Sequence, residues 1–175
     1  MQELAGPLII AHWNRKSVTY FASPGHYFIG AFEARYAFPF PSDFRSLLEL
    51  TDGNAIDDAP GCDPAGFSFR TLQRYDFHKL LSGDFVTFCD YRPEAWRYAL
   101  WRPQESIETR VVLLGAEPKP LVVAESFFDF ARAYVAGSER LHIDGARHYT
   151  ERSGIARPEL TPDEEKLFWS DAMRR

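Results

Sequence analysis

Four short apolar runs follow one another in the middle of the chain, and this arrangement limits the possible folds more than any other feature. The runs are Phe85–Cys89, Trp96–Trp101, Arg110–Leu114 and Leu121–Ala124. Apolar alternation, β-branched residues and flanking glycines and prolines are typical of strands. A parallel connection needs a crossover of a dozen or more residues, usually a helix, whereas the gaps here are short. We therefore expect antiparallel pairing.

A helix is predicted well before these runs. Ser23 is a capping residue, Pro24 suits a first helical turn, and Pro39–Pro41 must end the helix. Its apolar residues at helical spacing are Phe28, Ile29, Phe32 and Tyr36.

A second helix is predicted to begin at Pro41 or Ser42, with Asp43 near its positive end. Gly53 is expected to end this helix. Its buried residues should be Phe44, Leu47 and Leu48. After a loop over 54–66, Phe67–Phe69 resembles a brief strand, and 72–81 is compatible with a helical turn.

Two further helices are predicted after the strands. Ser126 caps one that ends at Gly137, and Thr161–Glu164 forms a capping box before a short last helix that carries Leu167 and Phe168. The stretch 138–160 between them is polar and is expected to be irregular.

The order of helices, then strands, then helices predicts an α+β class. We expect a single domain over residues 1–175, with a mainly antiparallel sheet of about four to six strands flanked by helices. Its core should span about 23–137, and 138–175 should be a C-terminal extension with a short helix. The first 22 residues fit two short strands, Pro7–Ala11 and Ser17–Phe21, or an irregular arm.

Composition excludes several classes of protein. The chain has 175 residues, 45% hydrophobic and 15% aromatic, which fits one folded domain and not a disordered chain. The net charge of −5 argues against a nucleic-acid binder. The two cysteines, Cys62 and Cys89, form no disulfide framework, and Glu3 precedes the apolar stretch Leu8–Ala11 where a signal peptide would carry positive charge. A cytoplasmic protein with no membrane segment is expected.

The sequence carries no common catalytic signature. It has no nucleophile elbow, P-loop, dinucleotide-binding glycines or zinc-protease helix motif. The best metal candidate is the group His142, Asp144 and His148, although its spacing is not that of a known zinc site and Arg147 would oppose a cation. We expect no cofactor and no catalytic residue, with a metal-dependent enzyme or small hydrolase as the less favoured alternative.

Two segments are candidates for binding a partner. One is an acidic loop, and the other links two strands with an acid and large aromatic residues of the kinds that anchor protein interfaces. The candidate partner-binding residues are Asp57, Asp58 and Asp63 in the loop, and Asp90, Tyr91 and Trp96 at the strand junction.

Several segments occur in an order that resembles the SUKH superfamily. Phe28–Tyr36 is similar to its opening helix, I-x-x-F-E-x-x-Y, and Phe40–Leu48 to its stretch L-P-x-D-[YF]-x-x-[FL]-L. The other matching segments are Leu50–Asn54, Asp84–Asp90 and Ala124–Phe130. Asp52 stands where asparagine is frequent in the family. The resemblance covers about 23–137.

The superfamily groups bacterial toxin-immunity proteins with fungal cell-wall regulators of the Smi/Knr type. The resemblance therefore implies a non-catalytic bacterial immunity protein whose partner is a cognate toxin or effector protein. Many such toxins are basic enzymes that act on nucleic acids, and an acidic protein would be steered towards them. The alternative within the family is a regulatory or scaffold module that binds a protein other than a toxin.

Overall fold

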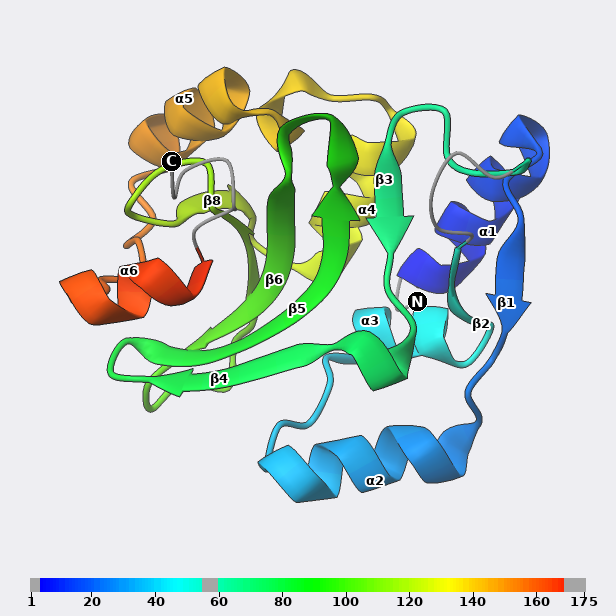
Figure 1. The fold of residues 1–175 in the computed structure, drawn as a ribbon, viewed down its shortest axis with the longest axis horizontal. Coiled ribbons are helices and arrows are strands. Elements are labelled where there is room, and N and C mark those ends of the chain that lie inside the picture. Colours follow the sequence, from blue (N-terminus) through cyan, green and yellow to red (C-terminus); the bar gives the residue numbers. More distant parts are fainter. Residues whose placement is uncertain (1–3, 55–59, 169–175) are drawn as a thin grey trace.

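The computed structural model describes residues 4–54 and 60–168. Within these residues the protein has six α-helices, an antiparallel sheet of six strands and a second sheet of two strands (Figure 1). The predicted α+β class is confirmed. The helices are α1 (Ala5–Lys16), α2 (His26–Tyr36), α3 (Ser42–Leu48), α4 (Phe127–Val135), α5 (Ile143–Ser153) and α6 (Pro162–Phe168). The strands are β1 (Tyr20–Ala22), β2 (Thr51–Asn54), β3 (Phe67–Phe69), β4 (Asp76–Leu80), β5 (Gly83–Tyr91), β6 (Trp96–Pro103), β7 (Arg110–Leu114) and β8 (Leu121–Ala124).

The long strand β5 organises the large sheet. One edge of β5 pairs with β6, and the sheet continues through β7 to β8. The other edge is shared, because β4 pairs with the first half of β5 and β3 pairs with Cys89–Tyr91 at its end. Every pair in this sheet is antiparallel, as the short connections predicted.

A β-bulge at Phe88 changes which side chains of β5 face the main core. Thr87 pairs with Ala99 and Cys89 pairs with Tyr98, so Phe88 has no partner of its own in β6. Without a bulge, successive side chains alternate between the two faces of a strand. Here Phe88 and Cys89 both join the main core.

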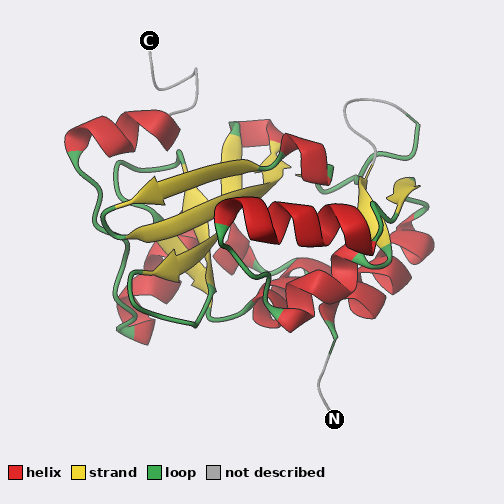
Figure 2. Cartoon of the chain, turned by 90° about the horizontal axis from the view of Figure 1, so that it is seen from below, coloured by secondary structure: helices red, strands yellow, loops and turns green. Residues whose placement is uncertain are grey.

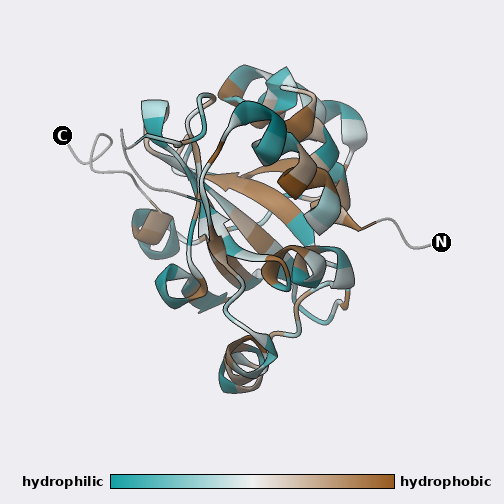
Figure 3. Cartoon of the chain, turned by 90° about the vertical axis from the view of Figure 1, so that its right-hand side faces the viewer, coloured by the Kyte–Doolittle hydropathy of each residue, from teal (hydrophilic) through white to brown (hydrophobic). Residues whose placement is uncertain are grey.

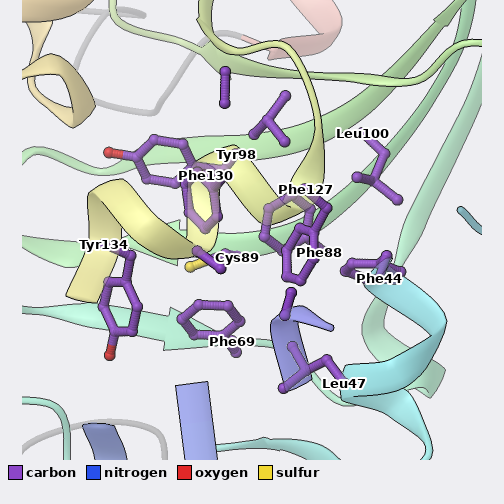
Figure 4. Packing of buried hydrophobic residues seen from close by; sticks show 14 of the residues in the cluster. Phe44, Leu47, Phe69, Phe88, Cys89, Tyr98, Leu100, Phe127, Phe130 and Tyr134 are labelled. Carbon is purple, nitrogen blue, oxygen red and sulfur yellow. The ribbon is translucent and has the colours of Figure 1, made fainter. Parts of the chain in front are cut away.

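Helices α1, α3 and α4 form the main core with one face of the sheet. α4 lies against β7 and β8, and α1 packs on α3 and α4. Figure 4 shows the aromatic centre of this core, where Phe44, Phe88, Phe127 and Phe130 meet. The rings of Phe44 and Phe127 lie 4.6 Å apart at 89°, and such edge-to-face pairs contribute about 0.5–1.5 kcal/mol beyond their burial.

The opposite face of the sheet is covered by the C-terminal segment. Phe85, Trp101 and Val122 form a smaller core there with Phe168 of α6. The Thr150 hydroxyl of α5 donates a hydrogen bond to the Val122 carbonyl at 2.9 Å. The expectation of irregular structure over 138–160 is therefore wrong for Ile143–Ser153, because this polar helix is stabilised by its packing on β8.

The N-terminal segment differs from both predictions made for it, two short strands or an irregular arm. Pro7–Ala11 lies in helix α1 and not in a strand or an arm. Ala5, Ile9 and Trp13 recur every fourth residue and are completely buried, so one face of α1 belongs to the main core. The predicted strand Ser17–Phe21 is confirmed only in its last residues, as β1.

Two predicted helix ends lie elsewhere. α2 begins at His26, so Ser23 does not cap it; the Ser23 hydroxyl instead donates to the Leu48 carbonyl at 2.8 Å. α3 ends at Leu48, so Gly53 does not terminate it but lies in β2 with φ of +91°. A Cβ on Gly53 would lie 2.4 Å from the Phe69 carbonyl oxygen, which explains why glycine is needed there.

Three further local predictions are confirmed. Ser126 caps α4 by accepting a hydrogen bond from the Asp129 amide at 3.1 Å, and Thr161 and Glu164 form the reciprocal capping box of α6. The helical turn predicted within 72–81 is a 3₁₀ turn at Leu72–Arg74. In the described part of the chain, every helix is too short or too polar to span a membrane.

Candidate functional site

The acidic loop does not present its predicted residues as a group. Asp57 and Asp58 lie outside the described residues. Asp63 is only 4% exposed, so its assignment to a partner-binding surface is wrong. One carboxylate oxygen of Asp63 accepts from the Ala65 amide at 2.8 Å, and the other accepts from the Tyr134 hydroxyl.

The Tyr134 hydroxyl connects Asp63 to the N-terminal helix. It also accepts a hydrogen bond from the Trp13 indole at 2.8 Å. Burial, and then the charge of Asp63, raises the pKa of Tyr134 well above its usual value, so this hydroxyl stays protonated and donates to Asp63. The network Trp13–Tyr134–Asp63 therefore ties α1, α4 and the loop after residue 60 together.

Asp90, predicted at the strand junction, is occupied by an internal ion pair. Arg70 binds it through two hydrogen bonds, Nε to Oδ2 at 2.8 Å and Nη2 to Oδ1 at 2.7 Å, and reaches Asp76 through Nη1 at 2.6 Å. Burial alone would lower the pKa of Arg70, but the hydrogen bonds and charges of Asp90 and Asp76 raise it. Arg70 thus joins β4 and β5 in the gap where β3 ends.

Tyr91 and Trp96 lie together, as the sequence suggested. They are cross-strand partners at the β5–β6 turn, with ring centroids 5.7 Å apart and an interplanar angle of 26°. Tyr91 also contacts Phe67 and His142 through its ring. Both aromatic side chains are half-buried, so they stabilise the turn and leave only part of their surface for a partner.

The residues of the metal candidate do not converge. His142 precedes α5 and packs on Tyr91, whereas Asp144 is 90% exposed on α5 and pairs with Arg147 at 3.1 Å. His148 is exposed one turn further along. Among residues 4–54 and 60–168, no group of three or more His, Cys, Asp or Glu side chains is arranged to hold a metal ion.

A groove that sequence analysis did not predict lies along α2. Helix α2 runs along the edge of the molecule opposite the β5–β6 turn, and it lies in front in the view of Figure 2 (Figures 1 and 2). The groove measures about 350 Å³ and separates α2 from β2 and the turn Leu72–Arg74. Its main walls are Phe28, Phe32 and Tyr36 on α2, and Asp52, Leu72 and Tyr75 opposite.

Aromatic residues are exposed at one end of this groove. Tyr27 is 81% exposed and Phe28 is 58% exposed, and their rings contact each other edge to face at 5.4 Å. Phe21 of β1 and Leu50, which directly precedes β2, are exposed as well. Figure 3 shows α2 at the bottom of the molecule, with apolar and polar residues along the same helix. Large exposed aromatic residues of this kind mark interaction sites.

The inner side of α2 explains how an exposed helix keeps its position. Ile29 is buried in the main core. The Glu33 carboxylate accepts from the Phe40 amide at 2.9 Å and pairs with Arg45 at 2.5 Å. The groove therefore has one wall anchored by a buried residue and an ion pair, which makes it a fixed feature of the fold.

The sequence did contain a signal for this surface. Phe28 fits the buried stripe of the helix by spacing, but the structure exposes it, and Tyr27 falls off that stripe altogether. A helix with large apolar residues beyond one face has more apolar surface than a single core contact can cover. Asp52, Leu72 and Tyr75 come from other segments, and no local pattern links them to α2.

The chain was also compared with known proteins. No family model matches it, and no curated protein matches it. The resemblance to the SUKH superfamily therefore stands on the motifs quoted above and is carried forward as a proposal.

Proposed function

We propose that this protein is a non-catalytic immunity protein that binds and neutralises a cognate bacterial toxin by stoichiometric contact. The observation that carries this proposal is the aromatic groove along α2, with Tyr27 and Phe28 exposed at its end. Tyrosine and other aromatic residues near a pocket supply much of the binding energy of protein interfaces. A well-formed groove beside exposed aromatic residues is suited to binding another protein.

The proposal of a toxin as partner rests on the same helix. Phe28–Tyr36, the segment that resembles the opening helix of the SUKH superfamily, supplies one wall of the groove. The net charge of −5 would attract a basic toxin over long range. The carboxylates of Asp63 and Asp90 serve the fold, so the aromatic residues of α2 replace them as the centre of the proposed interface.

Affinity capture with a toxicity assay tests this function. The tagged full chain is expressed in its own host, and a stoichiometric partner is expected that is toxic alone and harmless when co-expressed. Tyr27→Ser combined with Phe28→Ser should weaken capture and protection by roughly tenfold or more, because both rings are exposed to the partner. Ile107→Ser is the matched control, since Ile107 is 97% exposed far from α2 in the sequence and lines no part of the groove.

Other outcomes would contradict the proposal. Capture of a non-toxic regulatory protein would favour the scaffold alternative. One zinc ion per chain in the purified protein, lost on replacing His142 and His148, would favour the metal-dependent alternative. If the double variant of Tyr27 and Phe28 protected the host as well as the wild-type protein does, α2 would not be part of the interface.

A further inference from the structure

Asp52 is a partly buried carboxylate on the inner wall of the groove. Its Oδ1 accepts a hydrogen bond from the Leu72 amide at 2.6 Å. Among the described residues nothing donates to its Oδ2, and no cation lies within ion-pair distance. A carboxylate in this position keeps unused capacity to accept hydrogen bonds from a charged donor.

Asp52 is partly removed from solvent, so its charge is less stabilised by water than the charge of an exposed carboxylate. Burial raises the pKa of Asp52, although the hydrogen bond from Leu72 acts in the opposite direction. Asp52 and Tyr75 line the same groove, and the pKa of Tyr75 is raised by burial and then by the Asp52 charge. A bound cation would compensate the desolvated carboxylate.

The opposite wall is built from aromatic rings. Phe32 contacts Tyr75 edge to face at 6.0 Å across the groove, and Phe32 and Tyr36 lie 4.7 Å apart along α2. Aromatic faces attract cations, and the guanidinium of arginine does so most often. Arg35 of this protein already lies 5.2 Å from the Tyr36 ring centroid at the rim, so a guanidinium fits this type of surface.

We propose that the groove along α2 receives an arginine side chain presented by the bound protein partner, with the guanidinium between the aromatic wall and Asp52 Oδ2. This inference rests on the proposed function, because it names the chemistry by which that interface recognises a basic partner. A planar guanidinium suits the site better than an ammonium, since it stacks on rings, is more weakly hydrated and presents several donors. A volume of about 350 Å³ is at the small end of ligand pockets and suits one side chain rather than a helix.

Arg35 is the one groove-lining cation, among the described residues, that opposes this assignment. It is exposed, stands on the tyrosine ring and makes no ion pair with Asp52 in the described structure. It would therefore repel an incoming guanidinium weakly, through solvent. Removing Arg35 should strengthen the binding of arginine, whereas removing the charge of Asp52 should weaken it. The two variants therefore test the proposal in opposite directions.

A peptide titration examines the site without any toxin. Acetyl-Gly-Gly-Arg-Gly-Gly-amide is titrated into the ¹⁵N-labelled full chain, beside the same peptide with neutral citrulline in place of arginine. The arginine peptide should bind with a Kd of about 1 mM, as expected for so small a ligand, and should shift amide signals at Asp52, Leu72 and Gln73. The citrulline peptide, and a third peptide with lysine in place of arginine, should bind more weakly.

Three variants make the titration specific. Asp52→Asn should weaken the arginine peptide roughly fivefold and abolish the preference over citrulline. Arg35→Ala should strengthen it roughly twofold. Asp144→Asn, which removes an equally negative but 90% exposed carboxylate on α5, should change nothing. Thermal unfolding should show Asp52→Asn to be as stable as wild type, because an amide oxygen still accepts from Leu72 and a desolvated charge is removed.

The failure of this inference differs from failure of the proposed function. Equal binding of the arginine and citrulline peptides, or of lysine and arginine peptides, would overturn the arginine site. So would a captured toxin that binds Asp52→Asn as tightly as wild type, and the immunity function would then still stand. A selective arginine site in a protein that captures no toxin would support the site and reject the function.

Discussion

At the scale of single residues, Tyr134 holds together parts of the chain that are far apart in the sequence. Its hydroxyl accepts from Trp13, 121 residues away, and donates to Asp63, 71 residues away. Both partners are buried. Loss of this hydroxyl would leave a buried indole N–H and a buried carboxylate oxygen without a partner, which is costly in a protein interior.

Tyr134→Phe should therefore lower the free energy of unfolding by about 1–3 kcal/mol. Chemical denaturation followed by tryptophan fluorescence measures this change. Tyr27→Phe is the matched control, because Tyr27 is 81% exposed and its variant should stay within about 0.5 kcal/mol of wild type. Equal stability of the two variants would show that the hydroxyl network contributes little.

The same residue shows why site prediction from sequence failed at Asp63. An aspartate in a loop rich in Asp, Pro and Gly is usually exposed. Asp63 accepts from the Tyr134 hydroxyl on α4, which itself accepts from the Trp13 indole on α1. The position of these two helices is decided by the packing of the whole chain. Tyr91 and Trp96 could be paired in advance, because a short turn between adjacent strands brings its own two ends together.

At the scale of elements, the contact between α1 and α3 depends on a glycine. Gly6 in α1 donates its amide to the Ser46 hydroxyl at 3.0 Å. A Cβ at Gly6 would lie 2.2 Å from the Ser46 carbonyl oxygen, a distance that real Cβ atoms do not show. The two helix backbones can approach this closely only because position 6 has no side chain.

Gly6→Ala should destabilise the protein by about 1–3 kcal/mol, even though alanine favours a helix more than glycine does. Gly30→Ala in α2 is the opposite case, because its Cβ would meet no atom within 4 Å, and it should stabilise by about 0.5–1 kcal/mol. Thermal or denaturant unfolding should show a lower free energy of unfolding for Gly6→Ala and a higher one for Gly30→Ala. A stabilised Gly6→Ala would mean that α1 can move away from α3 at little cost.

Strands were easier to predict than the first and fifth helices for a physical reason. β5 to β8 carry the strand pattern in their own residues. α1 has Pro7 and the run Leu8–Ile10 near its start, which resembles a strand locally, and only its packing on α3 and α4 makes it helical. α5 has two buried residues, Ala146 and Thr150, so its helical face is too narrow to recognise.

At the scale of the whole molecule, both faces of the sheet are covered. The main core lies beneath α1, α3 and α4, and the smaller core lies beneath the C-terminal segment. The order of elements predicted this class, because strands with short connections must pair locally while the flanking helices cover them. No local sequence pattern predicts the groove beside α2, because its other wall is formed by residues of β2 and of the turn after β3.

The net charge of −5 leads to a prediction about association. With a basic toxin, raising the salt concentration from about 0.05 M to about 0.5 M should slow association by roughly tenfold and change dissociation much less, because salt screens long-range attraction. Stopped-flow mixing measures both rates. An association rate independent of salt would mean that charge does not guide the encounter, and that the contact depends on the aromatic residues of α2.

The bulge at Phe88 also affects how the gene can change. Phe88 is the one residue of β5 between Thr87 and Cys89 that has no partner in β6, so deleting it would remove the bulge and leave the other pairs in register. Cys89 and Tyr91 would keep facing the main core, and only the ring of Phe88 would be lost from it. In a strand without a bulge, the same three-nucleotide deletion would exchange the faces of every residue on one side of it.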